Sequence, residues 1–74
     1  MEKKDILKKF GAIVKSKRDE KNLTRQEFAT NTGLTITQVE KIEEGEIDTP
    51  FPTIVIIAKT LQIQLPELLK DFEI

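Results

Sequence analysis

Few side chains in this sequence could do chemistry. The 74 residues include no Cys and no His, and Ser16 is the single serine. Zinc sites built on thiolates or imidazoles and the common nucleophile–His arrangements are therefore excluded. Carboxylates and lysines remain, and a chain this short buries only part of one cleft. The inventory favours a binding protein over an enzyme, and we expect no metal, no cofactor and no small-molecule ligand.

Charge is unevenly distributed along the sequence. The totals are 12 Lys and Arg against 13 Asp and Glu, but residues 1–25 hold nine basic and four acidic side chains, whereas residues 26–74 hold three and nine. The basic start is either a solvated helix face or a surface that faces phosphate or acidic groups. No apolar run is as long as a membrane span, and no signal-peptide core follows the first lysines. We therefore expect a cytoplasmic protein that does not bind a membrane.

Short helices within one domain, residues 1–74, must position these groups. The hydrophobic pattern fits five helices. The first helix should end near Asn22. Its apolar stripe consists of Ile6, Phe10, Ile13 and Val14.

The second helix has a start signal and a stop signal. Thr24 is the expected N-cap, with Glu27 completing a capping box and Leu23 placed to pack against Phe28. The segment 30–33, which ends in a glycine, should break this helix.

The third helix is expected from about Ile36 to Glu44, with Thr35 as its cap and Gly45 ending it in the left-handed conformation. Its spacing turns two side chains inward and four outward. The inward pair is Val39 and Ile42, and the outer face is Ile36, Thr37, Glu40 and Lys41.

The fourth segment, after a proline-containing loop at 48–52, reads as either a strand or a helix because residues 53–57 are all β-branched. No second strand-like run exists to pair with it, which favours a helix. Its stripe is Ile54, Ile57, Ala58 and Leu61, and a last helix starting near Gln64, with Pro66 in its first turn, should bury Leu65, Leu68 and Leu69.

Two short helices joined by a glycine-containing turn form a helix-turn-helix unit. Fixed spacings relate Phe10-Gly11, Val14, Arg18, Leu23-Thr24, Glu27-Phe28-Ala29, Gly33-Leu34-Thr35, Val39, Ile42-Glu43, Gly45, Ala58, Leu61 and the Gln64–Leu69 ending. This pattern covers about residues 10–69 and resembles the phage-repressor and Cro-type, xenobiotic-response-element-like helix-turn-helix family. The resemblance implies an all-α, five-helix, lambda-repressor-like bundle. Its second and third helices would form the helix-turn-helix, with the third in the major groove of DNA.

The resemblance also implies site residues. The DNA contacts carried over are Arg25, Thr35, Ile36, Thr37, Gln38 and Lys41. Arg25 stands where the family usually has Gln and would meet a phosphate, as would Thr35 at a helix N-terminus. Ile36 would read a thymine methyl, and Lys41 would reach either guanine or a phosphate.

Thr37 would meet base edges in this assignment and Gln38 the DNA backbone. The resemblance further implies a buried ion pair between Arg18 and Glu43, the alternative being ordinary surface charges.

Acidic residues weigh against DNA binding. Residues 40–48 hold five acids and only Lys41 as a base. Glu40 would repel phosphate unless it accepts a bond from cytosine N4. The alternative for the acidic run as a whole is a solvated loop that points away from the duplex.

Two apolar side chains of the fourth helix lie off its stripe and need cover. We expect a two-fold interface of Val55, Ile56, Phe72 and Ile74, the alternative being that the tail packs over this patch. The resulting hypothesis is a sequence-specific transcriptional regulator, of the kind found among small repressors, that binds a palindromic operator in double-stranded DNA as a homodimer. The alternative is a protein-interaction or antitoxin-like module whose acidic third helix and loop bind a basic partner.

Overall fold

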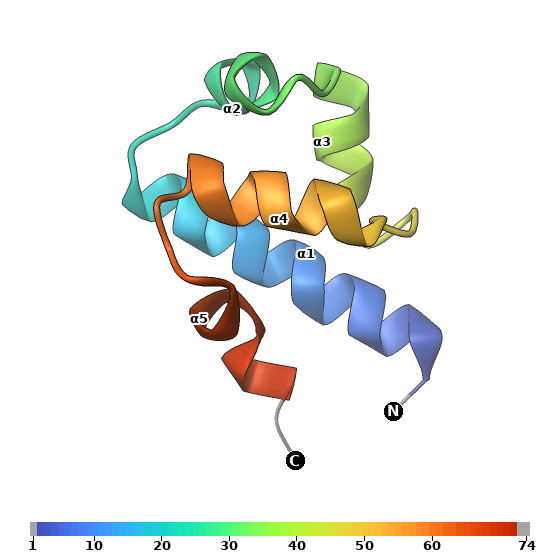
Figure 1. The fold of residues 1–74 in the computed structure, drawn as a ribbon. Coiled ribbons are helices and arrows are strands. Elements are labelled where there is room, and N and C mark those ends of the chain that lie inside the picture. Colours follow the sequence, from blue (N-terminus) through green and yellow to red (C-terminus); the bar gives the residue numbers. More distant parts are fainter. Residues whose placement is uncertain (1, 73–74) are drawn as a thin grey trace.

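The computed structural model describes residues 2–72, which form an all-helical bundle with no strand among them (Figure 1). The expected five-helix, all-α fold is confirmed. The elements are α1 (Lys3–Glu20), α2 (Arg25–Thr32), α3 (Ile36–Glu43), α4 (Phe51–Thr60), α5 (Leu65–Leu69) and a closing 3-10 turn, η1 (Lys70–Phe72).

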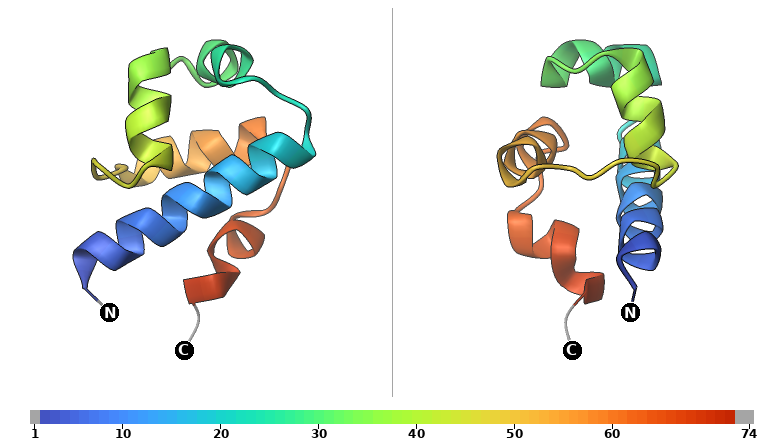
Figure 2. Two further views of the ribbon diagram at one scale, coloured as in Figure 1. Left: turned by 180° about the vertical axis from the view of Figure 1, so that it is seen from behind. Right: turned by 90° about the vertical axis from the view of Figure 1, so that its right-hand side faces the viewer.

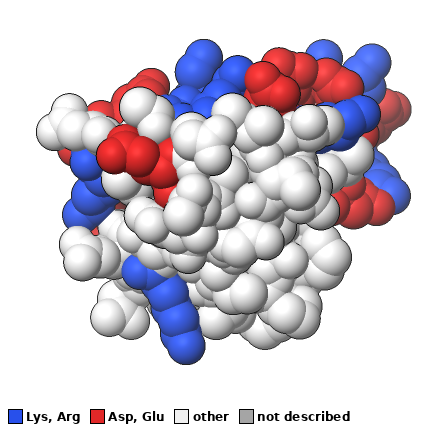
Figure 3. Space-filling view, turned by 90° about the horizontal axis from the view of Figure 1, so that it is seen from above, with Lys and Arg blue, Asp and Glu red and all other residues white. Residues whose placement is uncertain are grey.

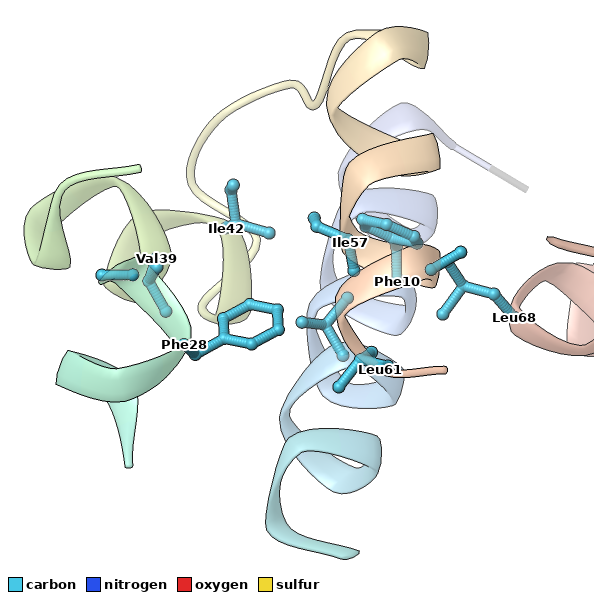
Figure 4. Packing of buried hydrophobic residues seen from close by; sticks show 10 residues of the cluster. Phe10, Phe28, Val39, Ile42, Ile57, Leu61 and Leu68 are labelled. Atoms are coloured by element: carbon cyan, nitrogen blue, oxygen red, sulfur yellow. The ribbon is translucent and has the colours of Figure 1, made fainter. Parts of the chain in front are cut away.

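The helices are arranged around the pair α1 and α4. Two further views show α2 and α3 on one side of this pair and α5 on the other (Figure 2). The core lies between them, with Phe28 of α2 pointing toward Ile57 of α4 and toward Leu61, which directly follows that helix (Figure 4). The buried apolar residues are Phe10, Val14, Phe28, Ala29, Val39, Ile42, Ile57, Ala58, Leu61 and Leu68.

The boundaries of α2 follow from its caps. Thr24 and Glu27 form the expected capping box, and Gly33 ends the helix with φ 78°. The helix continues through Thr32, however, so the predicted break over residues 30–33 is wrong except at its glycine. Thr32 is buried at the end of the helix, and its hydroxyl donates to the carbonyl of Phe28 at 2.8 Å, so this polar group has a partner within the helix.

The β-branched segment is helical, as the absence of a pairing strand indicated, but α4 begins earlier than expected. Phe51 and Pro52 belong to the first turn and not to the preceding loop. Proline fits there because the first N–H groups of a helix have no intrahelical acceptor. Burial of Ile57, Ala58 and Leu61 then holds the helix against the core.

Five predicted core positions are less buried than their spacing suggested, and two of these, Ile13 and Ile54, are half-buried against the core. Ile6 is 40% exposed because the first turns of α1 lie at the edge of the bundle (Figure 1). Leu65 and Leu69 are half-buried and pack against the core, whereas Leu68 is fully buried. A five-residue helix presents only one side chain directly to the core.

Candidate nucleic-acid interface

The outer face of α3 is open to solvent. Ile36 is 41% exposed, and Thr37 and Lys41 are also exposed. Val39 and Ile42, on the opposite side, are buried among α1, α2 and α4. The helix is therefore fixed to the bundle by one stripe and presents the other, as a helix that enters a groove must do.

The start of α3 is held by a second capping box. The hydroxyl of Thr35 accepts from the backbone N–H of Gln38 at 3.0 Å, and the side-chain oxygen of Gln38 accepts from the N–H of Thr35 at 2.8 Å. The family resemblance places Gln38 only against the DNA backbone, although Thr-x-x-Gln is the same capping-box signature as Thr24-x-x-Glu27. Gln38 thus has a structural role, and its amide oxygen is already engaged.

A buried ion pair joins α1 to the end of α3. Arg18 Nε donates to Glu43 Oε2 at 2.7 Å, and Arg18 Nη2 donates to Glu43 Oε1 at 3.2 Å. Arg18 Nη1 also donates to the carbonyl of Leu23, at 2.7 Å. The side chain of Glu43 has no exposed surface. The hydrogen bond that Arg18 donates to Glu43 raises the pKa of the Arg18 guanidinium, and burial acts in the opposite direction.

Arg25 joins the same carboxylate from α2. Its Nε donates to Glu43 Oε1 at 3.0 Å, and its Nη1 lies 3.7 Å from Glu40 Oε2. The side chain of Arg25 is 30% exposed. Glu43 therefore accepts from one arginine of α1 and one of α2, which fixes the first three helices to one another. No local pattern indicates this second partner, because residues 25 and 43 are brought together only by the fold.

The acidic residues that follow α3 are partly engaged with one another and with α1. A hydrogen bond with Glu46 and the charge of that carboxylate raise the pKa of Glu44, although Arg25 and Lys41 act in the opposite direction. Asp48 pairs with Lys3 of α1 at 2.9 Å. Seen from above, acidic and basic side chains are intermixed along one edge of the molecule (Figure 3).

The four residues predicted to form a dimer interface are not equivalent. Ile56 is 43% exposed and Val55 is half-buried on α4. Phe72 is also half-buried, but it packs against the core of its own chain, with Lys9 Nζ 5.5 Å from its ring centre. Ile74 lies outside the described residues. Phe51, which is 62% exposed at the start of α4, is not among the residues predicted for the interface.

An all-α bundle with two short capped helices joined at Gly33, the second exposing its outer face, is a helix-turn-helix domain of the kind found in transcriptional regulators. The helix-turn-helix family HTH_3 matches residues 14–68, and the chain belongs to this Cro/C1-type family.

Solved structures show the same fold. The restriction-modification controller protein C.AhdI from Aeromonas hydrophila is 30% identical, with a TM-score of 0.83, and the match covers 86% of this chain and 97% of that one. ComR from Streptococcus suis is 32% identical over 92% of this chain, with a TM-score of 0.78. An HTH_3 family transcriptional regulator from Vibrio cholerae, 20% identical over 95% of this chain, has a TM-score of 0.86.

The chain spans 22% of that ComR structure and 39% of the Vibrio regulator. No curated protein sequence matches the chain significantly. Within residues 2–72, no helix is both long and apolar enough to span a bilayer.

Proposed function

We propose that this chain is a sequence-specific transcriptional regulator that binds a palindromic operator as a homodimer, with α3 in the major groove. The observation that carries the proposal is the exposed outer face of α3 on a helix held in place by its cap and by buried residues. The likeness to C.AhdI over most of both chains supports the same class of activity. Residues 1–74 would act together as one DNA-binding domain.

The proposed contacts divide into base readers and phosphate binders. Ile36 and Thr37 would meet base edges, and Ile36, which cannot donate a hydrogen bond, would contact a thymine methyl. Lys41, one turn later, would reach guanine or a phosphate. Thr35 and the first N–H groups of α3 would meet a phosphate, since a helix N-terminus carries partial positive charge.

Two further side chains would contact the DNA backbone. Gln38 would do so through its amide nitrogen, because its oxygen accepts from Thr35. Arg25 would bind a phosphate with its guanidinium nitrogens.

The proposed dimer uses α4. Phe51 and Ile56 expose apolar surface there, beside half-buried Val55. Exposed apolar surface of this kind marks an interface in small soluble domains. A two-fold axis through it would place two α3 helices about 34 Å apart, one turn of DNA. Phe72 would contribute only the part of its ring that its own core leaves open.

A second candidate function is a protein-interaction module that binds a basic partner. The specific observation in its favour is the acidic end of α3, where the neighbouring carboxylate of Glu46 raises the pKa of Glu44. Preference among DNA sequences separates the two candidates, because salt weakens both an acidic–basic protein contact and, through counterion release, DNA binding. If this chain binds a basic protein and not DNA, it should show no preference among oligonucleotides.

Selection of random DNA duplexes on the purified protein, read by sequencing, tests the proposal. We expect a palindromic motif whose half-sites lie about one helical turn apart. The matched control is a double variant, Ile36→Ala with Lys41→Ala, which keeps the buried face of α3 and should lose the motif. Enrichment of no sequence by the parent protein would reject the DNA-binding function and favour the protein-interaction module.

A further inference from the structure

The guanidinium of Arg25 is held by two carboxylates of α3 that differ in burial and in geometry. Glu43 accepts from Nε at 3.0 Å, and its side chain has no exposed surface. Glu40 lies 3.7 Å from Nη1, beyond hydrogen-bond distance, and its side chain is 45% exposed. The first contact is therefore part of the buried structure, and the second is a loose pair at the surface.

Each arginine of this centre has a further carboxylate beside it on the solvent side. The single buried carboxylate of Glu43 accepts from both Arg18 and Arg25, so these three groups together carry one net positive charge. Asp19 lies 3.4 Å from Arg18 Nη1 and Glu40 lies 3.7 Å from Arg25 Nη1, so the solvent-side carboxylate that faces Arg25 is that of Glu40. A phosphate diester has the same charge as a carboxylate and binds the same guanidinium nitrogens.

We propose that Glu40 is an internal competitor of DNA phosphate for Arg25 and thereby sets the affinity of the domain. This inference rests on the proposed DNA-binding function. In the free protein Glu40 occupies the anion position beside Nη1. On DNA a phosphate takes that position, while the bond from Nε to Glu43 keeps Arg25 at the site in both states. Glu40 consequently opposes binding in two ways, through the pair that must be broken and through repulsion by the phosphates.

A double-mutant cycle separates these two effects. Glu40→Gln should tighten operator binding by about two- to five-fold in the parent, since exposed ion pairs contribute modestly and the repulsion is removed with them. The Arg25→Gln background carries the residue usual in the family and has no Arg25–Glu40 pair. There Glu40→Gln can relieve only the repulsion between Glu40 and the DNA phosphates. Glu40→Gln should then change affinity by less than about 1.5-fold.

A second acid provides the matched control. Glu46→Gln removes the same charge near the end of α3, and no ion pair joins Glu46 to Arg25 among the described residues. Its effect on affinity should be the same in both backgrounds, and raising the salt concentration should reduce the coupling between Arg25 and Glu40. Unfolding of each variant, followed by circular dichroism, confirms that the proteins compared are folded.

Each outcome has a separate meaning. If Glu40→Gln raises operator affinity more in the parent than in the Arg25→Gln background, Glu40 competes with phosphate for Arg25. If Glu40→Gln tightens operator binding equally in both backgrounds, the inference is overturned, but the proposed function stands as long as the parent selects an operator. Weaker operator binding by Glu40→Gln in the parent has the same meaning. If the parent binds no duplex at all, the proposed function itself fails.

Discussion

The backbone of Gly11 in α1 lies directly against the backbone of Glu43 in α3. A β-carbon added at Gly11 would be 2.5 Å from the Glu43 carbonyl oxygen and 2.7 Å from its carbonyl carbon. No other residue type allows this approach, because every other side chain begins with a β-carbon. The same contact brings the buried carboxylate of Glu43 within reach of Arg18 on the next turns of α1.

We therefore predict that Gly11→Ala destabilises the fold. Alanine is the better helix former, by about 1 kcal/mol, but the clash is with backbone that cannot rotate away, so the net loss should be about 2–3 kcal/mol. Gly33→Ala is the control, since a β-carbon there meets nothing within 4 Å and only the φ of +78° opposes it. That change should cost about 1 kcal/mol. Urea unfolding measures both, and an unchanged midpoint for Gly11→Ala would contradict the close contact.

The ion centre gives an ordered set of stabilities. Glu43→Ala leaves two arginines facing each other in a buried site and should cost about 3–5 kcal/mol. Arg18→Ala should cost less, about 2–3 kcal/mol, because Arg25 still donates to the carboxylate. Lys17→Ala, which loses only partly exposed pairs to Glu20 and Glu67, should change stability by under about 1 kcal/mol. Thermal melting ranks the three.

The same experiment separates folding from recognition. Arg18 lies in the interior, 7% exposed. Folded Arg18→Ala protein, assayed below its melting temperature, should keep the base preference of the parent. A melting curve identical to that of the parent would show that the pair contributes nothing, and an altered base preference would show that Arg18 acts on recognition.

The sequence predicts the helices better than it predicts the ion centre. Val39, Ile42 and Gly45 follow from local spacing and from the preference of glycine for positive φ, and the structure places all three as expected. The contact between Arg25 and Glu43 spans 18 positions and depends on the angle between α2 and α3. Hydrophobic periodicity does not predict the angle between two helices, so the sequence pattern does not indicate that Arg25 binds Glu43 as well as phosphate.

DNA affinity should depend on pH through Glu44. Its raised pKa means that it binds a proton above the usual range for glutamate, so its negative charge is lost as pH falls through that raised value. Binding should therefore tighten as pH falls from 7 toward the raised pKa, because a neutral carboxyl no longer repels phosphate. Stability should also rise slightly over the same interval, since the folded state holds the proton more tightly than the unfolded state. Lys41 and Arg25 act against this shift.

The comparison that isolates Glu44 is Glu44→Gln, which should bind more tightly at pH 7 and show a flatter dependence on pH. Fluorescence anisotropy with a labelled operator measures both proteins across the range. Parallel pH profiles for parent and variant would assign the dependence to other groups.

The exposed face of α4 gives a prediction about assembly. Replacing Ile56 or Phe51 with Glu should shift the sedimentation of the protein at micromolar concentration from dimer to monomer, since a charge in an apolar interface loses its solvation. Glu at Thr37, which is exposed on α3, is the control and should leave the dimer intact. A parent protein that sediments only as monomer, with and without operator, would exclude this interface.

The groove assignment is tested by comparing three alanine variants on operators that each carry one changed base pair. Ile36→Ala should relax the preference at one position of each half-site, because the thymine methyl loses its apolar contact. Lys41→Ala should weaken binding, and should relax a second position only if the lysine contacts a base. Arg25→Ala should weaken binding to all sequences alike and reduce the salt slope by about one unit, as expected for one phosphate contact.

The control for lost positive charge is Lys59→Ala. Lys59 is exposed in the last turn of α4, away from the face of α3, and its loss should leave the pattern of base preference unchanged. A lower overall affinity alone does not distinguish the three groove variants from this control. Each must show the change in base preference, affinity or salt slope that is predicted for it. Should all of them bind every duplex as the parent does, α3 does not read DNA, and the acidic end of this helix becomes the first surface on which to seek a protein partner.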